Sequence, residues 1–540
     1  MAPVRAKWFA TRTCSTKRWL PIWLIVVALV TSWLQPAAAN AQARNQPGCT
    51  SVPARFGRMF RQLPAASWPA ADVDLLATKL IAEEETEPTP EGQADDEENN
   101  DIDAGVTYVG QFIDHDLTRD PRPDDLTTPI DPFSLPNART PAFDLDSLYG
   151  GGSHSSPQLY EADGVHLKLG TPLTGSSTDT GAVDLPRDAN GQALLGDPRN
   201  DENRIVAQLH SIFLRFHNLL ADRIARANPR WPKERVFAAA QEQVRLHYQW
   251  AVLTDFLPSI VDRQTIQAVL PSMDARLLPS RLAFYDPCTM NMPVEFSVAA
   301  YRFGHSIVRP IYRLNTTVVD RLPVFSLTND PTRDLAGFRP SPKNFAIDWS
   351  FFFQMDAERK IGRPQVSYKI DNSLVFPLSL LPLPETGAGP ASLAKRNFLR
   401  SMQLGLPSGQ DVARTMGFRP LRDDQILIGK ATGDPADTVA IRTVGAGFAG
   451  KAPLWTYVLA EATAGAFNVH DGHIDGPQIA PMRLGPVGGR IVTETFVGLM
   501  MIDRSSVLYK PWFYPDRAFS RNGRFGFREL IRAVTMNRPR

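Results

Sequence analysis

The sequence has few cysteines, almost no net charge and few long apolar runs, and each scarcity excludes a class of protein. Three cysteines among 540 residues are too few for a metal site built on cysteine ligands. A formal charge of +1 offers no electrostatic basis for binding nucleic acid. Beyond residue 43, no segment is apolar enough to cross a membrane. The remaining composition, 43% hydrophobic and 21% charged, is typical of a large globular protein.

Residues 1–43 have the three parts of a secretory signal peptide. A basic start without acidic residues is followed by the apolar run LPIWLIVVALVTSWL and then by PAAANAQA. We expect cleavage after Ala39, Ala41 or Ala43, and a secreted or periplasmic protein. The alternative is an uncleaved membrane anchor, because Trp19 to Ala39 is just long enough to span a bilayer.

Cleavage of this leader would remove Cys14 and leave Cys49 and Cys288. These two thiols either pair in an oxidising compartment or are unrelated buried thiols, and the sequence leaves both open. Residues 44–104 are predicted to be an N-terminal extension that ends in an acidic, apolar-poor loop from residue 83 to residue 103. No internal repeat is present.

Apolar spacing beyond these segments is mostly helical. Asp197 and Pro198 resemble an N-cap and first helical residue, so we expect a helix from about Pro198 to Ile224. A second long helix is predicted over residues 236–257. Strand-like alternation is scarce, and 46 prolines with 36 glycines indicate long irregular connections. The predicted fold class is mainly α with little β.

Four short segments hold titratable or amide side chains among apolar neighbours. In GQFIDHDLTRD, a helix would place Gln111 and His115 on one face, with Asp114 and Asp116 elsewhere. The others are GDPRNDENRI, YRFGHS and RNFLRSMQLGLPS. Each alone has a structural explanation, such as a core histidine or charges that favour a helix start.

Together, and in this order, the segments resemble the animal-type haem peroxidases. The matching stretches are YVGQFIDHDLTRDP, RTPAFDLDSLYG, GDPRNDENRIVAQLHSIFLRFHN, YRFGHS and RNFLRSMQLGLPS. The resemblance extends over most of residues 100–540 and implies one large catalytic domain at 105–540. It also implies haem b as cofactor. The enzyme would use hydrogen peroxide to oxidise halides, thiocyanate or small organic donors through a ferryl-haem intermediate.

The resemblance assigns roles around the haem. His115 is similar to the distal histidine that moves a proton on peroxide, with Arg199 as the neighbouring cation and Gln111 orienting the small molecule. His305 is similar to the proximal iron ligand, and Asn397 to the residue that holds its other ring nitrogen.

Further positions are similar to residues that hold the haem. Arg302 and Arg400 match partners of the haem propionates, and both could equally be surface charges. Asp114 and Glu202 match the carboxylates that form esters with the haem. Asn203 stands where relatives with a sulfonium link to the haem carry methionine, so that link is absent and efficient chloride oxidation is doubtful. At residues 403 and 404 the chain has Gln-Leu where many relatives have Asp-His.

The resemblance also implies a structural calcium ion. Asp116 matches a calcium ligand, and the ligand set would be completed by Thr140, the Ala142 carbonyl, Asp144 and Asp146. Hard oxygen donors of this kind suit Ca²⁺.

Two alternatives remain. The first is a haem-dependent fatty-acid dioxygenase of the same superfamily. Its radical tyrosine would stand where this chain has Arg302, and Tyr301 is one position away, a rotation of ~100° on an α-helix. The second is a non-catalytic, calcium-stabilised interaction module. The sequence gives no oligomeric state, and membrane contact would follow only from an uncleaved leader.

Overall fold

The computed structural model describes most of the chain beyond residue 54. The described residues are 55–84, 89, 93, 95–121, 126–272, 281–286, 292–325, 330, 332–355, 360, 362–381 and 389–536. Residues 50–540 form one compact unit. The predicted leader, Cys49, Cys288 and residues 85–88, 90–92 and 94 of the predicted acidic loop lie outside the described residues. The loop prediction was wrong for its last part, because Glu98–Asp103 pair with Val366–Tyr368 and form a strand. None of the described helices is long and apolar enough to cross a membrane.

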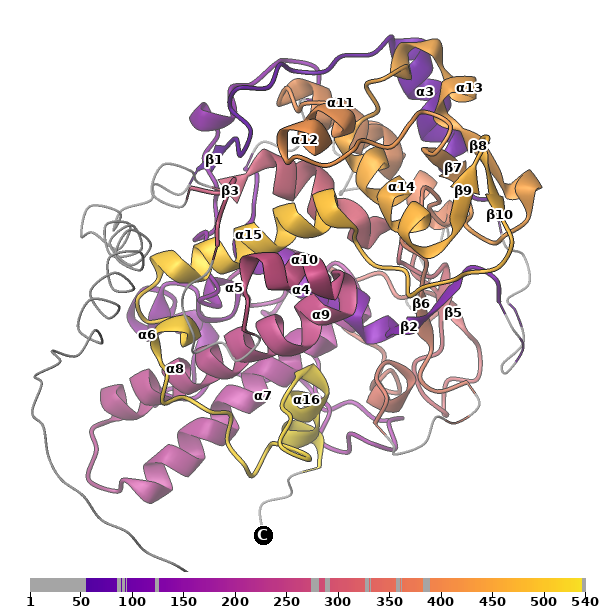
Figure 1. The fold of residues 1–540 in the computed structure, drawn as a ribbon. Helices are drawn as coiled ribbons and strands as arrows, with labels where there is room; N and C mark the ends of the chain where they lie inside the picture. The colour runs from indigo at the N-terminus through magenta and orange to yellow at the C-terminus, as the bar shows by residue number, and fades with distance from the viewer. Residues whose placement is uncertain are drawn as a thin grey trace, which may run out of the picture. The chain divides into compact units, whose positions relative to one another are not determined.

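Helices dominate this unit, as predicted (Figure 1). The α-helices are α3 (Ala70–Lys79), α4 (Ala104–Leu117), α5 (Asp146–Tyr149), α6 (Gly152–Ser155), α7 (Arg204–Ala227), α8 (Lys233–Ala251), α9 (Leu257–Ile260), α10 (Arg263–Val269), α11 (Leu393–Gln403), α12 (Gly409–Thr415), α13 (Ile441–Val444), α14 (Leu454–Ala466), α15 (Pro486–Ile502) and α16 (Phe527–Thr535).

The strands of the described part are short and pair two by two. The pairs are β1 (Phe56–Gly57) with β3 (Met292–Pro293), β2 (Glu98–Asp103) with β6 (Val366–Tyr368), β4 (Ile311–Tyr312) with β5 (Leu322–Pro323), β7 (Leu427–Gly429) with β8 (Thr438–Ala440), and β9 (Asn468–His470) with β10 (His473–Asp475). Only β1 and β3 run parallel. The mainly α prediction with little β is confirmed.

Residues before α4 belong to the same compact unit as the rest. β1 and β2 pair with strands that lie more than 200 residues later, and α3 packs against α11. The division predicted between residues 104 and 105 therefore coincides with the start of α4 and not with a boundary between compact units.

The start of the first predicted long helix was wrong by six residues. Residues Pro198–Asp201 form a separate 3₁₀ turn, η4, capped by the side chain of Asp197. The α-helix begins only at Arg204, because Asn203 adopts an extended backbone and its side chain accepts hydrogen bonds from the amides of Ile205 and Val206.

The second predicted helix is present but interrupted. α8 continues into a π-helical turn, Val252–Phe256, and then into α9. α7 and α8 lie side by side in the lower part of Figure 1. A π-helical turn, η6 (Glu295–Ala299), followed by a 3₁₀ helix, η7 (Ala300–His305), forms the segment that carries His305.

Aromatic packing fixes α4 inside the core. Phe112 stacks on Phe213 of α7 at 4.6 Å and meets the ring of Tyr248 of α8 edge-on. At Gly105, a Cβ atom would lie 2.3 Å from the ring of Phe353, so only glycine allows this approach. α4 thus has a fixed position from which its polar residues face a cavity.

Candidate functional site

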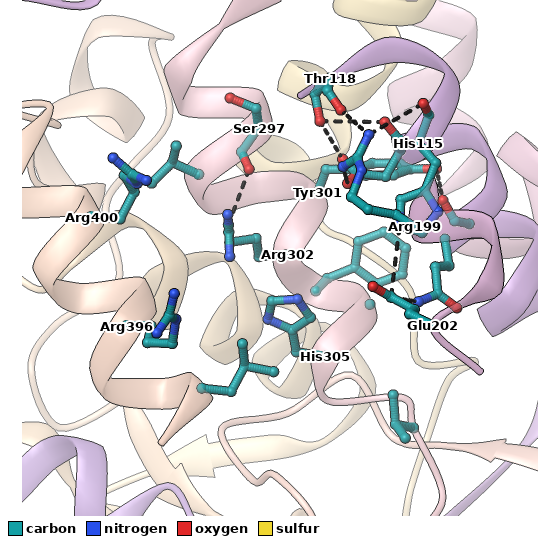
Figure 2. Close-up of a pocket in the computed structure, with 18 of the residues that line it drawn as sticks. His115, Thr118, Arg199, Glu202, Ser297, Tyr301, Arg302, His305, Arg396 and Arg400 are labelled. Carbon is teal, nitrogen blue, oxygen red and sulfur yellow. Dashed lines mark hydrogen bonds and ion pairs between the residues drawn. The ribbon is translucent and has the colours of Figure 1, made fainter. Parts of the chain in front are cut away.

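One cavity of about 670 Å³ gathers most of the polar residues singled out in the sequence (Figure 2). α4, η4 and the residues before α7 form one side, while η6, η7 and α11 contribute the other. The predicted haem-site residues that line it are Gln111, Asp114, His115, Arg199, Glu202, Arg302, His305 and Arg400. Asn397 lies outside the lining, in contact with His305. Residues almost 300 positions apart therefore share one space.

His115 is a buried, neutral imidazole. Its Nδ1 lies 2.9 Å from the Asn200 side-chain oxygen, and its Nε2 lies 3.7 Å from Glu202 Oε1. Burial, reinforced by the nearby Arg199 cation, lowers the pKa of His115 to about 3. At neutral pH this ring therefore has one nitrogen lone pair available to take up a proton.

Gln111 is fixed by two neighbours beside His115. Its amide nitrogen donates to Glu202 Oε1, and its oxygen accepts a hydrogen bond of 2.9 Å from the Asn203 side chain. Asn203 thus caps α7 with its oxygen and orients Gln111 with its nitrogen.

Arg199 is held by one carboxylate and two backbone carbonyls. Its Nε and Nη2 lie 3.1 and 2.8 Å from the oxygens of Asp197, and Nη2 also donates to the carbonyls of His115 and Thr118. Although burial opposes the effect, Arg199 holds the pKa of Asp197 well below its usual range. The guanidinium therefore has a fixed position, with Nη1 3.8 Å from Asp114 Oδ2.

Asp114 and Glu202 expose carboxylate surface to the same cavity. Their side chains are 32% and 24% exposed, whereas Asp197 is fully buried. Thr118 donates a hydrogen bond of 3.0 Å to Asp114 Oδ1. Burial raises the pKa of Asp114, although Arg199 and Arg302 oppose this shift. Both carboxylates can thus reach a ligand in the cavity.

His305 faces the cavity from η7 and is backed by α11. Its Nδ1 lies 2.9 Å from the Asn397 side-chain nitrogen, while Arg302 donates a hydrogen bond of 2.6 Å to the Asn397 oxygen. Because a guanidinium can only donate, Arg302 fixes which end of this amide faces the imidazole. Burial lowers the pKa of His305 to about 3, so this ring is also neutral.

Arg400 is buried and is not the surface charge that its sequence context allowed. It forms an ion pair of 2.8 Å with Asp120 and donates to the Gln403 side chain. Gln403 in turn donates to the Thr128 carbonyl. Gln403, which stands where many relatives have aspartate, thus helps to hold Arg400 in the cavity wall.

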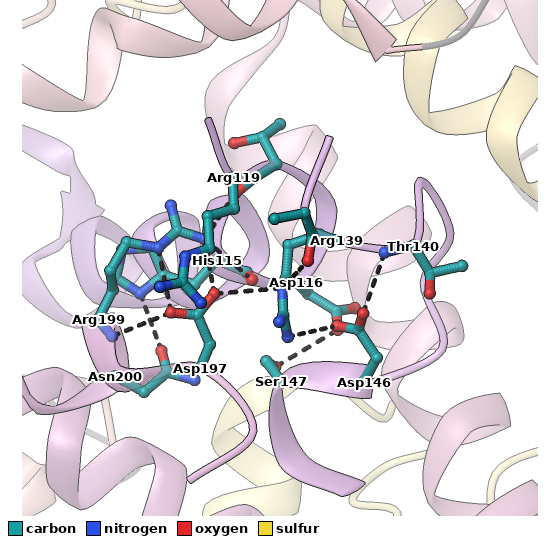
Figure 3. Close-up of polar contacts among 12 residues, drawn as sticks. His115, Asp116, Arg119, Arg139, Thr140, Asp146, Ser147, Asp197, Arg199 and Asn200 are labelled. Carbon is teal, nitrogen blue, oxygen red and sulfur yellow. Dashed lines mark hydrogen bonds and ion pairs between the residues drawn. The ribbon is translucent and has the colours of Figure 1, made fainter. Parts of the chain in front are cut away.

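A separate cluster of carboxylates includes one residue of α4, and Figure 3 labels two of its members, Asp116 and Asp146. Asp116, Asp144 and Asp146 each offer one oxygen, and these oxygens lie within 4.8 Å of one another. Oδ2 of Asp116 is buried without a hydrogen-bond partner. Burial, followed by repulsion from Asp146, raises the pKa of Asp144 to about 7. Such a group of acidic oxygens fits a hard divalent cation.

The loop before this cluster contains the remaining predicted ligands. The backbone nitrogen of Thr140 donates to Asp146, and that of Ala142 donates to the Thr140 carbonyl. Arg139, which the sequence did not suggest, lies between Asp146 at 3.2 Å and Asp197 at 3.4 Å.

Comparison with known proteins assigns the family. Residues 118–336 match the family model described as animal haem peroxidase. The chain carries an animal haem peroxidase domain. Peroxinectin A of Dictyostelium discoideum is 25% identical over 290 residues, which are 52% of this chain and 49% of that protein. Chorion peroxidase of Aedes aegypti is 26% identical over 42% of this chain and 27% of its own length. The chain thus spans half or less of these relatives.

Solved structures of related fold cover more of the chain. Peroxidase A from Dictyostelium discoideum superposes with a TM-score of 0.55 at 18% identity, over 85% of this chain and 89% of that one. A fatty acid alpha-dioxygenase from Oryza sativa also gives 0.55, at 16% identity over 90% of this chain and 80% of that one. These likenesses concern the fold alone.

The family match does not cover the whole cavity. The matched range of the animal haem peroxidase domain contains Arg199 and His305, but it begins after His115 and ends before Asn397. The structure adds these two residues to the site: His115 on α4 lines the cavity, and Asn397 on α11 contacts His305 from outside the lining.

Sequence reasoning missed several residues around this cavity. Arg396 lines it one helical turn before Arg400, and this spacing of four was a usable signal. Asn200 and Asp197, which contact His115 and Arg199, gave no comparable signal.

Tyr301 corrects an expectation. The ~100° rotation argued from the sequence does not remove Tyr301 from the cavity, because Tyr301 and Arg302, both on the 3₁₀ helix η7, line it together. Its hydroxyl donates a hydrogen bond of 3.1 Å to the Gly110 carbonyl.

Proposed function

We propose that this chain is a haem peroxidase, which uses hydrogen peroxide to oxidise halides, thiocyanate or small organic donors. The observation that supports this most is the pair His115 and His305. They line one cavity, both are neutral, and each has an amide partner at its Nδ1. The family match and the peroxidase relatives agree with this proposal.

The residues present fit a haem. His305 would provide the nitrogen ligand for the iron, and Arg302, Arg396 and Arg400 offer cations for the two haem carboxylates. Bound haem would supply the redox-active iron that passes electrons from the donor to peroxide. If His305 binds iron through Nε2, its Nδ1 carries the proton and needs an acceptor. In this structure the Asn397 oxygen accepts from Arg302 and the Asn397 nitrogen faces His305 Nδ1, so iron binding through Nε2 would require this amide to reverse.

On the α4 side, the chain provides proton transfer and a fixed positive charge. The lone pair on His115 would take the proton of peroxide and return it to the departing oxygen. Arg199, which Asp197 locks in place, would stabilise the charge that develops there. Gln111 would hold peroxide or a halide, because Glu202 and Asn203 fix its amide.

Two further assignments belong to this proposal. Asp114 and Glu202 would form the haem esters, since both expose oxygen atoms to the cavity. With Asn203 in place of methionine, no sulfonium link is expected. Ca²⁺ would occupy the cluster of Asp116, Asp144 and Asp146, completed by Thr140 and the Ala142 carbonyl. Secretion or periplasmic export is proposed from residues 1–43 alone.

The fatty-acid dioxygenase alternative gains support from Tyr301. A tyrosine hydroxyl beside the cavity is what a radical-forming oxygenase would need, and a dioxygenase shares the fold. The non-catalytic calcium-stabilised module has no such support, because a binding module needs neither histidine.

The absorption spectrum of the purified, haem-supplied protein tests these proposals. The peroxidase proposal predicts a Soret band that shifts on adding hydrogen peroxide and returns with bromide, thiocyanate or a phenol. His115→Leu should bind haem but react with peroxide ~100-fold to 10,000-fold more slowly, whereas His305→Leu should lose the haem.

Two companion assays separate the alternatives. The dioxygenase predicts oxygen uptake with a fatty acid, which Tyr301→Phe would abolish. Haem that resists acid-organic extraction in the wild type, but not in an Asp114→Asn, Glu202→Gln double variant, would support the esters. A protein that binds no haem would overturn both enzyme proposals.

A further inference from the structure

The amide of Asn200 connects two buried histidines. Asn200 is completely buried on η4, directly after Arg199. Its oxygen lies 2.9 Å from His115 Nδ1 and its nitrogen 3.0 Å from His210 Nδ1 (Figure 3 shows the His115 end). His115 and His210 come from different helices, α4 and α7, so this one side chain joins two elements of the core.

The orientation of this amide decides which nitrogen of His115 carries the proton. The amide oxygen can only accept, so His115 Nδ1 must donate and the free lone pair is on Nε2, the nitrogen on the Glu202 side. The amide nitrogen can only donate, so His210 Nδ1 accepts and its proton is on Nε2, which is buried without a hydrogen-bond partner. With the amide reversed, His115 would carry its proton on Nε2 and could not act as a base.

Several contacts hold the bridge in place. The ring of His210 lies edge-on to Phe112 of α4, at 6.0 Å. The η4 turn is capped by Asp197 and pinned by backbone bonds from Gly337 and Phe338 to the carbonyls of Glu202 and Asp201. A Cβ atom at position 337 would lie 1.6 Å from the Asp201 carbonyl oxygen, so glycine is required for this contact.

We propose that Asn200, itself oriented by His210, is a positioning residue that keeps the Nε2 lone pair of His115 available for proton uptake. This inference deepens the proposed peroxidase function and rests on it. The same short turn that carries Arg199 would thereby also fix the proton-transfer state of His115.

Three leucine variants of the haem-loaded protein test the proposal. Asn200→Leu removes the acceptor of His115, and His210→Leu removes the partner that orients the amide. His217→Leu is the matched control, because His217 is equally buried on α7 but is bonded to the Tyr149 hydroxyl and the Val165 carbonyl instead.

Two ligands separate proton uptake from general damage to the cavity. Hydrogen cyanide must lose its proton as it binds ferric haem, whereas carbon monoxide binds ferrous haem without proton transfer. In Asn200→Leu we expect the association rates of cyanide and peroxide to fall at least ~10-fold, with carbon monoxide unchanged within about twofold. His210→Leu should show a smaller fall in the same two rates, of roughly 3-fold to 10-fold, and His217→Leu none.

Unchanged cyanide and peroxide rates in Asn200→Leu would overturn the inference. So would an equal fall in the carbon monoxide rate, because the effect would then be structural. A wild type that binds haem but does not react with peroxide would refute the proposed function, while the cyanide comparison would still test the tautomer.

If the wild type takes up no haem, ¹⁵N-histidine NMR of the protein reads the tautomers directly. We expect an Nδ1–H signal from His115 that changes in Asn200→Leu, and an Nε2–H signal from His210. The opposite tautomer at His115 would overturn the inference.

Discussion

A divalent cation at the cluster of Asp116, Asp144 and Asp146 should stabilise the folded protein. Three carboxylate oxygens within 4.8 Å of one another repel, and burial denies them the screening of water. A cation that binds only the folded state adds about 2.7 kcal/mol at a free concentration 100-fold above its Kd. For a unit of this size, that corresponds to a Tm increase of roughly 3 °C.

The pH dependence of this effect has a definite sign. In the cation-free protein, the folded-state pKa of Asp144 is raised to about 7, above its unfolded value. The folded state then binds the proton more tightly, so its stability is fully present below the unfolded pKa and is lost as pH rises through about 7. A bound cation removes this loss. The difference in Tm between calcium-loaded and chelated protein should therefore widen from pH 5 to pH 8.

Scanning calorimetry with chelator, followed by added Ca²⁺, measures both effects. Asp144→Asn should be more stable than wild type in chelator, because it relieves repulsion, but should gain little from Ca²⁺. Asp222→Asn, which changes an exposed carboxylate outside the cluster, is the control and should respond like the wild type. A wild-type Tm that does not change on adding Ca²⁺ at any pH would refute the reasoning. So would a Ca²⁺-induced increase in the Tm of Asp144→Asn equal to that of the wild type.

Three further variants test individual contacts. Asn203→Ala should cost about 1 kcal/mol of unfolding free energy in urea, because α7 loses its cap; no loss would mean that the cap is dispensable. Phe112→Ala should cost ~3–5 kcal/mol, since the ring is fully buried against Phe213, and a value under about 1 kcal/mol would contradict this packing. Asp197→Asn should slow the peroxide reaction about 10-fold by releasing Arg199. Stopped-flow absorption measures this rate, and an unchanged value would show that the backbone carbonyls suffice to hold the guanidinium.

Local sequence patterns predicted the parts of the site that a single helix organises. A spacing of four placed Gln111 and His115 on one face of α4, and both line the cavity. Apolar spacing also located α8 within a few residues. The same reasoning placed the start of α7 six residues too early. Asp197 and Asn203 are both good caps, and only the extended backbone at Asn203 decides between them.

Such local patterns could not predict contacts between residues that lie far apart in the sequence. The sequence allowed Arg400 to be a surface charge, and its pairing with Asp120 from 280 residues earlier makes it part of the cavity wall. The sequence argument set Tyr301 aside because it stands one position from the expected site, whereas in the structure Tyr301 and Arg302 both line the cavity.

The sequence by itself determined the helical character, the order of the polar segments and the residue types available for haem and cation binding. Those properties depend on local spacing and on side-chain chemistry. Only the tertiary structure decided which partner each polar group has: Asn200 between two histidines, Arg302 on Asn397, and Arg139 between two carboxylates. Hydrogen bonds and ion pairs act over about 3 Å, and only folding brings residues such as His115 and Asn200, 85 positions apart, or Arg302 and Asn397, 95 positions apart, within that range.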